Sequence, residues 1–203
     1  MEEAHGGEDS EDKMASAATP QTRVEPAPPD GDVLYEVVNG EIRELPPMST
    51  LSGLVASVLA QHLGTFASQH KLGLVVVEML FRLTTDGQRQ RRPDVAFVAY
   101  DRLPDPIFST DDPPAWDVVP NLAVEVISPS NTAVEIVEKI QEYLDAGVQL
   151  VWVIYPGQRR VHVYEPPATS RVLLERDELD GGIVLPGFRL GVAALFEALA
   201  KPK

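Results

Sequence analysis

The stretch NLAVEVISPSN, residues 121–131, predicts a β-strand that runs into a turn and has one charged residue inside it. Residues 122–127 are apolar except for Glu125, which is the pattern of a buried β-strand. Pro129 and its polar neighbours predict a turn where the strand ends. Burying a lone carboxylate costs several kcal/mol unless it is paired, protonated or bound to a metal. Glu125 therefore needs an explanation that is either structural or functional.

A helix is predicted directly after this turn. Thr132 and Glu135 have the spacing of a capping box, and Gly147 predicts the end of the helix. Its apolar face is expected to contain six residues at helical spacing: Ala133, Ile136, Val137, Ile140, Tyr143 and Leu144. Further strands are expected within residues 148–156, 159–166 and 171–177, followed by a short strand and a last helix within 187–200.

The part of the chain before this stretch begins with a hairpin signal. Asn39-Gly40 lies between two short β-type runs of residues 33–45. A helix is predicted over residues 51–69, where these apolar residues have helical spacing: Leu51, Leu54, Val55, Val58, Leu59, Leu63 and Phe66. Residues 72–100 are interpreted as a strand, a turn at Asp86-Gly87 and a second strand.

The order of these elements predicts the domain organisation. Residues 101–120 contain five prolines and are expected to form a loop. Strands and helices then alternate irregularly, which predicts one α/β or α+β domain built on a mixed β-sheet over residues 33–200. Residues 1–32 are rich in Glu, Asp, Ala, Pro and Gly and poor in large apolar residues, so they are expected to be a disordered tail.

Composition excludes several classes of protein. The chain of 203 residues has no cysteine, which excludes disulfides, thiolate metal sites and cysteine catalysis. No apolar run approaches the roughly 20 residues of a membrane helix. The N-terminus is acidic, whereas a secretory signal is basic and then apolar, so a cytoplasmic protein is expected. Half of the net charge of −14 lies in residues 1–32, and the remainder is still acidic, which argues against strong nonspecific DNA affinity.

Asp94 and Glu125 are the two acidic residues embedded in the strand-like runs RPDVAFV and LAVEVIS. If the two strands are neighbours, both carboxylates can bind one hard cation such as Mg²⁺, which prefers oxygen ligands. Glu78, in the run VVVEMLFRL, is a third candidate. Lys139 lies on the following helix one turn before Tyr143, where it could orient a nucleophilic water or stabilise negative charge in a transition state.

Each of these residues also has an ordinary structural interpretation. An acid in a strand can lie on the solvated face of a half-covered sheet, and a helix lysine can extend into water. Four histidines are scattered without a ligand-like neighbour: His5, His62, His70 and His162. Three aromatic residues are expected in the core or at its rim, not as platforms for substrate: Trp116, Trp152 and Tyr155.

The chain resembles the Uma-two family of predicted endonucleases, which belongs to the PD-(D/E)xK superfamily. The resemblance covers about residues 33–197 and rests on six segments in the family's order: YEVVNGEIREL, VEMLFRL, RRPDVAFV, LAVEVISPSNTAVEIVEKIQEYLDAGVQLVWVIYP, RRVHVY and LPGFRLGVAALF. It implies a restriction-endonuclease-like fold, a mixed β-sheet flanked by helices.

The resemblance also implies roles for individual residues. Asp94 and Glu125 match the metal ligands of the family. Glu78 matches either a further ligand or a residue that contacts the ligands without binding the metal. The superfamily pattern places a lysine where this chain has Ile127, and Lys139 matches the helix lysine of the family instead. Three residues are expected to contact substrate: Ser128, Ser130 and Tyr143. Family members often carry a histidine at the start of the first long helix, where this chain has Ser52.

The function implied by the resemblance is a Mg²⁺-dependent (or Mn²⁺-dependent) endonuclease that cleaves DNA, with a homodimer expected for cutting both strands. The alternative is a catalytically inactive binding or scaffold protein with a nuclease fold, in which the acidic tail recruits a protein partner. The acidity of the chain, Ser52 and the displaced lysine favour this alternative. Glycoside hydrolysis by two carboxylates is a third interpretation, but it makes no use of Lys139.

Overall fold

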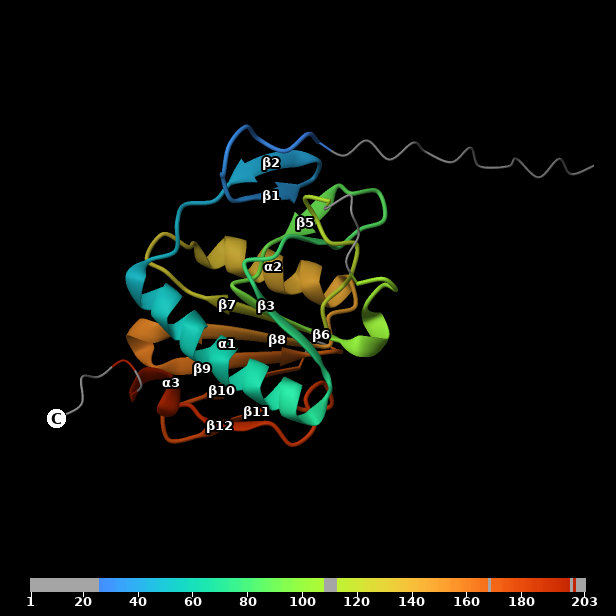
Figure 1. Ribbon diagram of the computed structural model, residues 1–203. Coiled ribbons are helices and arrows are strands. Elements are labelled where there is room, and N and C mark those ends of the chain that lie inside the picture. Colours follow the sequence, from blue (N-terminus) through green and yellow to red (C-terminus); the bar gives the residue numbers. More distant parts are fainter. Residues whose placement is uncertain (1–25, 108–112, 168, 198, 200–203) are drawn as a thin grey trace, which may run out of the picture.

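The centre of the protein is a six-stranded β-sheet with the order β10-β9-β8-β7-β6-β3 (Figure 1). The computed structural model describes residues 26–107, 113–167, 169–197 and 199. The six strands are β3 (Gly73–Val77), β6 (Val95–Ala99), β7 (Leu122–Val126), β8 (Leu150–Tyr155), β9 (Arg160–Glu165) and β10 (Thr169–Leu173). Only β7 and β8 pair in parallel, while the other pairs are antiparallel, so the sheet is mixed as predicted.

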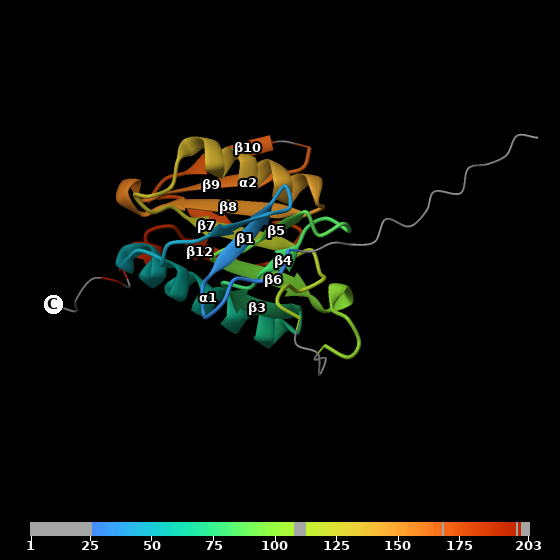
Figure 2. The same cartoon turned by 90° about the horizontal axis from the view of Figure 1, so that it is seen from above.

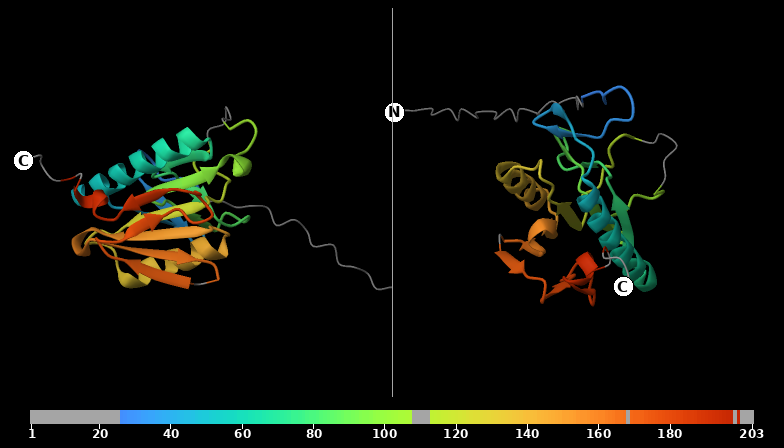
Figure 3. Two further views of the ribbon diagram at one scale, coloured as in Figure 1. Left: turned by 90° about the horizontal axis from the view of Figure 1, so that it is seen from below. Right: turned by 90° about the vertical axis from the view of Figure 1, so that its left-hand side faces the viewer.

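Two helices cover opposite faces of this sheet, as the right-hand view of Figure 3 shows. α1 (Thr50–His70) packs on one face, and α2 (Ala133–Asp145), which connects β7 to β8, packs on the other. The side chain of Ser49 caps α1, and the predicted capping box of Thr132 and Glu135 begins α2. Gly147, at φ 96°, follows the end of α2 and confirms the predicted stop.

A second, four-stranded sheet lies at the top of Figure 1 and crosses above the central sheet in Figure 2. Its order is β2-β1-β5-β4, with β1 (Tyr35–Val38), β2 (Glu41–Glu44), β4 (Phe81–Arg82) and β5 (Arg89–Arg91). Asn39 and Gly40 connect β1 and β2 with positive φ angles of 53° and 78°, which confirms the predicted two-residue hairpin.

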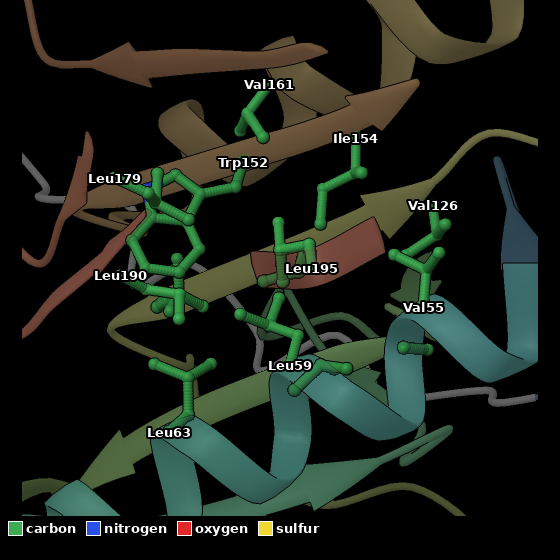
Figure 4. Close-up of a cluster of buried hydrophobic side chains, with 14 of the residues drawn as sticks. Val55, Leu59, Leu63, Val126, Trp152, Ile154, Val161, Leu179, Leu190 and Leu195 are labelled. Atoms are coloured by element: carbon green, nitrogen blue, oxygen red, sulfur yellow. The ribbon is translucent and has the colours of Figure 1, made fainter. Parts of the chain in front are cut away.

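The largest core fills the space between the central sheet, α1 and the C-terminal elements (Figure 4). These elements are the paired strands β11 (Glu178–Asp180) and β12 (Arg189–Gly191) and the short helix α3 (Ala194–Glu197). Trp152 is fully buried there, against Leu179 and Leu190 from the strand pair and Leu63 from α1. Full burial of one leucine side chain stabilises the fold by about 1.5–3 kcal/mol.

The structure corrects the predicted strands at several points. The first strand predicted within residues 72–100 breaks at Glu78, which is left-handed at φ 47°, so β3 and β4 belong to different sheets. Glu78 therefore follows a strand, and Asp94 precedes β6, where both were expected inside strands. The strand predicted over 171–177 is β10, which ends at Leu173, and β11 was not predicted.

The predicted apolar faces of both helices are wider than the buried ones. Leu51 and Leu54 of α1 are 48% and 49% exposed, and Val137 of α2 is 65% exposed. Ala133 is also exposed, whereas Ile136, Ile140 and Tyr143 of α2 are buried. Periodicity predicts the side of a helix, but the width of the covering sheet decides which residues are buried.

Parts of the predicted organisation lie outside the described residues. This holds for residues 1–25 of the expected tail, for 108–112 of the expected loop and for residues 198 and 200 of the expected last helix. Residues 26–32 contain no helix or strand. Among the described helices, none has the length and apolar character needed to cross a membrane.

Candidate active site

Asp94, directly before β6, lies beside Glu125 of the neighbouring strand β7. Val95 of β6 lies opposite Val124 of β7 in an antiparallel pair, and extending this register by one residue places Asp94 opposite Glu125. Oδ2 of Asp94 accepts a hydrogen bond of 2.5 Å from the backbone N–H of Val126. The pairing that the sequence could only assume is therefore present, and the fold itself holds the two carboxylates together.

Glu125 is buried on the sheet face that α2 covers, not on a solvated face. Its residue exposure is 5%. Oε1 accepts a hydrogen bond of 2.7 Å from the Tyr143 hydroxyl, and Oε2 lies 3.2 Å from Nζ of Lys139. Tyr143 is itself fully buried, so its hydroxyl fixes Glu125 and cannot contact a substrate as expected.

Lys139 lies between two carboxylates, which excludes the interpretation of a solvent-facing lysine. Its Nζ is 3.2 Å from Oε2 of Glu125 and 2.9 Å from Oε1 of Glu36, and its side chain is 12% exposed. Burial alone would lower the pKa of Lys139, but the charges of Glu125 and Glu36 outweigh it and raise that pKa. Lys139 therefore stays protonated.

Glu36 is a member of the site that the sequence analysis missed. It lies in β1, is 2% exposed, and accepts hydrogen bonds from Nη1 of Arg91 at 2.7 Å and from the backbone N–H of Arg92 at 3.0 Å. Burial would raise its pKa, but Lys139 and Arg91 outweigh burial and lower it. An acid in the apolar run YEVV is the same signal that marked Glu125 in LAVEV.

Arg91 extends this charged cluster to the far end of α2. Its Nε donates a 2.5 Å hydrogen bond to Glu142, whose other carboxylate oxygen lies 3.2 Å from Nε of Arg89. The cluster thus connects the four-stranded sheet to α2 through ion pairs. Arg91 pairs with both Glu36 and Glu142, and Glu36 in turn pairs with Lys139. This network of ion pairs restricts the side chain of Lys139 to one position beside Glu125.

Asp94, Glu125 and Lys139 line one pocket of about 70 Å³. Glu78, Ser128 and Ser130 line the same pocket, which also has an apolar wall that includes Pro46, Pro47 and Met48. A pocket of this size has room for an ion and a few water molecules. A nucleotide would have to lie across its mouth.

The electrostatics of the pocket favour a cation. Burial and then the charge of Glu125 raise the pKa of Asp94 from 3.8 to about 7. Burial raises the pKa of Glu125 as well, although Lys139 and the Tyr143 hydroxyl oppose the shift. The positive charge of Lys139 is therefore not enough to offset the burial of both Asp94 and Glu125. A bound cation would favour the ionised form of both carboxylates.

Glu78 lies close to this pair but does not complete a preformed ligand set. Its backbone N–H donates a 3.3 Å hydrogen bond to the carbonyl of Asp94, and its own carbonyl accepts one from the Arg92 guanidinium. Within the described parts of the chain, no three Asp, Glu or His side chains converge as a metal site. Any bound ion would depend on Asp94 and Glu125 together with oxygen atoms of water or substrate.

Ser128 and Ser130 lie in the turn after β7, and their hydroxyl oxygens are 2.8 Å apart. Both line the pocket, and Thr132, two residues after Ser130, caps α2. Ile127, where the resemblance led us to look for a lysine, packs against the apolar cluster under α2. Ser52 is buried at the start of α1 and donates a 3.3 Å hydrogen bond to the Ile127 carbonyl, so it joins α1 to β7.

None of the three histidines that the structure describes lines this pocket. His62 and His70 lie on the exposed side of α1, and His162 lies on β9. His5 lies outside the described residues.

The mixed sheet, its two covering helices and the paired carboxylates define a protein with the restriction-endonuclease-like fold. The crystal structure of "a putative nuclease belonging to DUF820" from Anabaena variabilis ATCC 29413 is similar to this chain, with a TM-score of 0.72 and 19% sequence identity. The similarity covers 85% of this chain and 94% of that one, and it shows a common fold. No curated protein matched the chain.

The family described as "Uma2: Putative restriction endonuclease" matches residues 24–193. The chain belongs to this family, which confirms the resemblance seen in the sequence.

Proposed function

We propose that the chain is a metal-dependent endonuclease that hydrolyses phosphodiester bonds of DNA, with Asp94 and Glu125 as ligands of Mg²⁺ or Mn²⁺. One observation carries the proposal: two adjacent carboxylates with raised pKa values lie in a pocket beside a lysine that stays protonated. Acids whose pKa values are raised by burial and by each other are characteristic of functional sites.

The donor set fits Mg²⁺ or Mn²⁺. Mg²⁺ binds oxygen ligands, keeps several waters, and is usually held by one or two carboxylates and the phosphates of a substrate. Asp94 and Glu125 supply two carboxylates, and Glu78 lines the same pocket as a further acid. When bound, such an ion acidifies a water molecule and polarises a phosphate oxygen.

Lys139 acts in this proposal as a fixed positive charge. Because its pKa is raised, it would stabilise the negative charge that develops on the phosphate in the transition state, and it would not serve as a base. Its contact with Glu125 and the hydrogen bond from Tyr143 orient the glutamate. Ser128 and Ser130 present hydroxyl groups at the pocket, where they could donate hydrogen bonds to the phosphate.

A second candidate is a binding or scaffold protein that retains the nuclease fold without cleavage. One observation favours it: Glu36 and Glu125 already neutralise Lys139, which leaves little positive charge for a phosphate. In this candidate the acidic residues 1–32 recruit a protein partner. A homodimer belongs to the nuclease proposal, since two sites related by a two-fold axis can cut both strands.

The test is cleavage of supercoiled plasmid DNA with Mg²⁺ or Mn²⁺. We expect the wild type to nick the plasmid, and Glu125→Ala and Asp94→Ala to lose at least about a hundredfold in rate. Glu178→Ala is the matched control, because Glu178 pairs with Arg189 on the surface. If the wild type does not nick DNA, or if the Asp94 variant nicks as well as the wild type, the nuclease proposal is wrong.

A further inference from the structure

A second, larger groove adjoins the active-site pocket at the carboxyl ends of the parallel strands β7 and β8. It has a volume of about 640 Å³, and its walls are mainly apolar, with Leu51, Ile127 and Tyr155 among them. Ser128 and Asn131 line both this groove and the active-site pocket. The two therefore form one continuous surface, and a ligand in the groove would reach the pocket.

An aromatic strip continues from the groove along β8 and β9. The rings of Tyr155 and His162 are 4.6 Å apart, and those of His162 and Tyr164 are 6.5 Å apart. His162 lies opposite Val153 and Tyr164 opposite Val151, so the strip occupies the sheet face on which α2 packs. All three residues are partly exposed, so a ligand can reach part of each side chain.

An exposed apolar residue of β10 lies beside the strip. Val172 of β10 lies opposite His162 and is 50% exposed. Val137 of α2 is 65% exposed, and it lies about 160° around the helix from Lys139, on the flank away from the active site. Figure 2 shows β9 and β10 beyond α2 at one edge of the molecule.

Arg160 adds a positive charge at one end of the strip. It is exposed, lies opposite Tyr155 in the β8–β9 pair, and shares its face of β9 with His162. Arg160 forms no ion pair with any residue that the structure describes, although the chain as a whole is acidic with a pI near 4.6. A cation in these surroundings is free to bind a phosphate.

We propose that the aromatic strip of Tyr155, His162 and Tyr164 binds bases of an unpaired DNA strand, and that Arg160 at its end helps to lead the backbone of that strand into the active site. The inference deepens the proposed nuclease function and rests on it for the identity of the nucleic acid. Bases of a single strand stack on aromatic rings with little regard to sequence, whereas the bases of a duplex already stack on each other. Duplex binding instead relies on many phosphate contacts, and among the described residues of the strip and its ends only Arg160 is an unpaired arginine.

The test measures binding without cleavage. In EDTA, fluorescence anisotropy would compare a labelled oligothymidylate with a duplex of equal length. We expect the single strand to bind the wild type about tenfold more tightly than the duplex. Tyr155→Ala and Tyr164→Ala should each weaken single-strand binding about five- to a hundredfold. Tyr155→Phe and Tyr164→Phe keep the rings and should bind like the wild type.

Two further variants separate the strip from general effects. Tyr100→Ala is the matched control, because Tyr100 is a 48% exposed tyrosine that follows β6 and lies outside the strip. It should not change binding. Arg160→Gln should reduce the slope of log affinity against log salt by about 0.7, the value of one lost phosphate contact with a single strand.

The outcomes distinguish this inference from the proposed function. If the wild type cleaves plasmid but binds duplex as tightly as single strand, or if the alanine variants bind normally, the inference is wrong and the nuclease proposal stands. If binding depends on the tyrosines but no metal supports cleavage, the inference stands and the nuclease proposal falls. If the alanine variants change only the oligomeric state in sedimentation, the strip is an interface between copies and the inference is wrong.

Discussion

Nζ of Lys139 lies 2.9 Å from Oε1 of Glu36, in an ion pair that is almost completely buried. β1 supplies Glu36 and α2 supplies Lys139, so the pair ties the four-stranded sheet to the central sheet directly beside Glu125. The position of the candidate catalytic lysine thus depends on a strand that lies about a hundred residues earlier in the chain.

The first prediction concerns the stability of this ion pair. Glu36→Gln leaves Lys139 and Arg91 with one fewer buried partner charge, and we expect the free energy of unfolding to fall by about 3 kcal/mol. Urea unfolding at neutral pH measures the change. Glu178→Gln is the control, since its partner Arg189 is largely exposed and the pair should contribute less than about 1 kcal/mol. Equal losses in both variants would contradict a structural role for Glu36.

The second prediction concerns the hydroxyl group behind Glu125. Tyr143→Phe removes the 2.7 Å hydrogen bond to Oε1 but keeps the buried ring. Loss of a partner that orients a metal ligand typically weakens metal binding about 10- to 100-fold, and we expect a loss in this range for Mn²⁺. Calorimetric titration gives the affinity, and Tyr100→Phe is the surface control. An unchanged affinity in Tyr143→Phe would show that this hydroxyl does not orient a ligand.

The third prediction is the pH dependence of metal binding. Burial and the charge of Glu125 raise the pKa of Asp94 to about 7, so below pH 7 the metal-free site holds a proton there that the ion must displace. Mn²⁺ affinity should fall by up to about tenfold for each pH unit below 7, with proton uptake by the buffer visible in the calorimetric heat. An affinity that stays constant between pH 6 and 8 would refute this.

The fourth prediction uses the same pKa without metal. The pKa of Asp94 in the folded protein lies above its ordinary value of 3.8, so the protonated carboxyl group adds to the free energy of unfolding. This contribution is fully present below about pH 4 and is lost as the pH rises through 7. Asp94→Asn has no proton to lose. The free energy of unfolding of this variant, relative to the wild type, should therefore increase from pH 5 to pH 8 in EDTA. A difference that does not vary with pH would show that Asp94 titrates normally.

The sequence predicted the part of the site that local patterns determine. The single charge in an apolar run identified Glu125, and the capping box and helical spacing placed Lys139 and Tyr143 on the following helix. Local patterns do not predict contacts between residues that are far apart in the sequence. The contact of Lys139 with Glu36 depends on how the hairpin of β1 and β2 lies over the central sheet, which no local signal in YEVVNG specifies.

Two local signals failed for identifiable reasons. Glu78 was expected inside a strand because its neighbours are apolar, but its left-handed backbone ends β3 and allows the chain to pass to the other sheet. Val137 was expected in the core because its spacing matches Ile140, but the sheet covers only one part of that face of α2. In both cases tertiary packing overrode a correct local pattern.

The central claim is that Asp94 and Glu125 together hold a divalent cation. Titration of Mn²⁺ into the metal-free protein, followed by calorimetry at pH 8, tests it most directly, with Glu125→Gln measured alongside. The account predicts that the wild type binds Mn²⁺ and that the variant, which keeps the shape of the side chain but loses its charge, does not. Equal binding by both proteins, or none by the wild type, would contradict the claim.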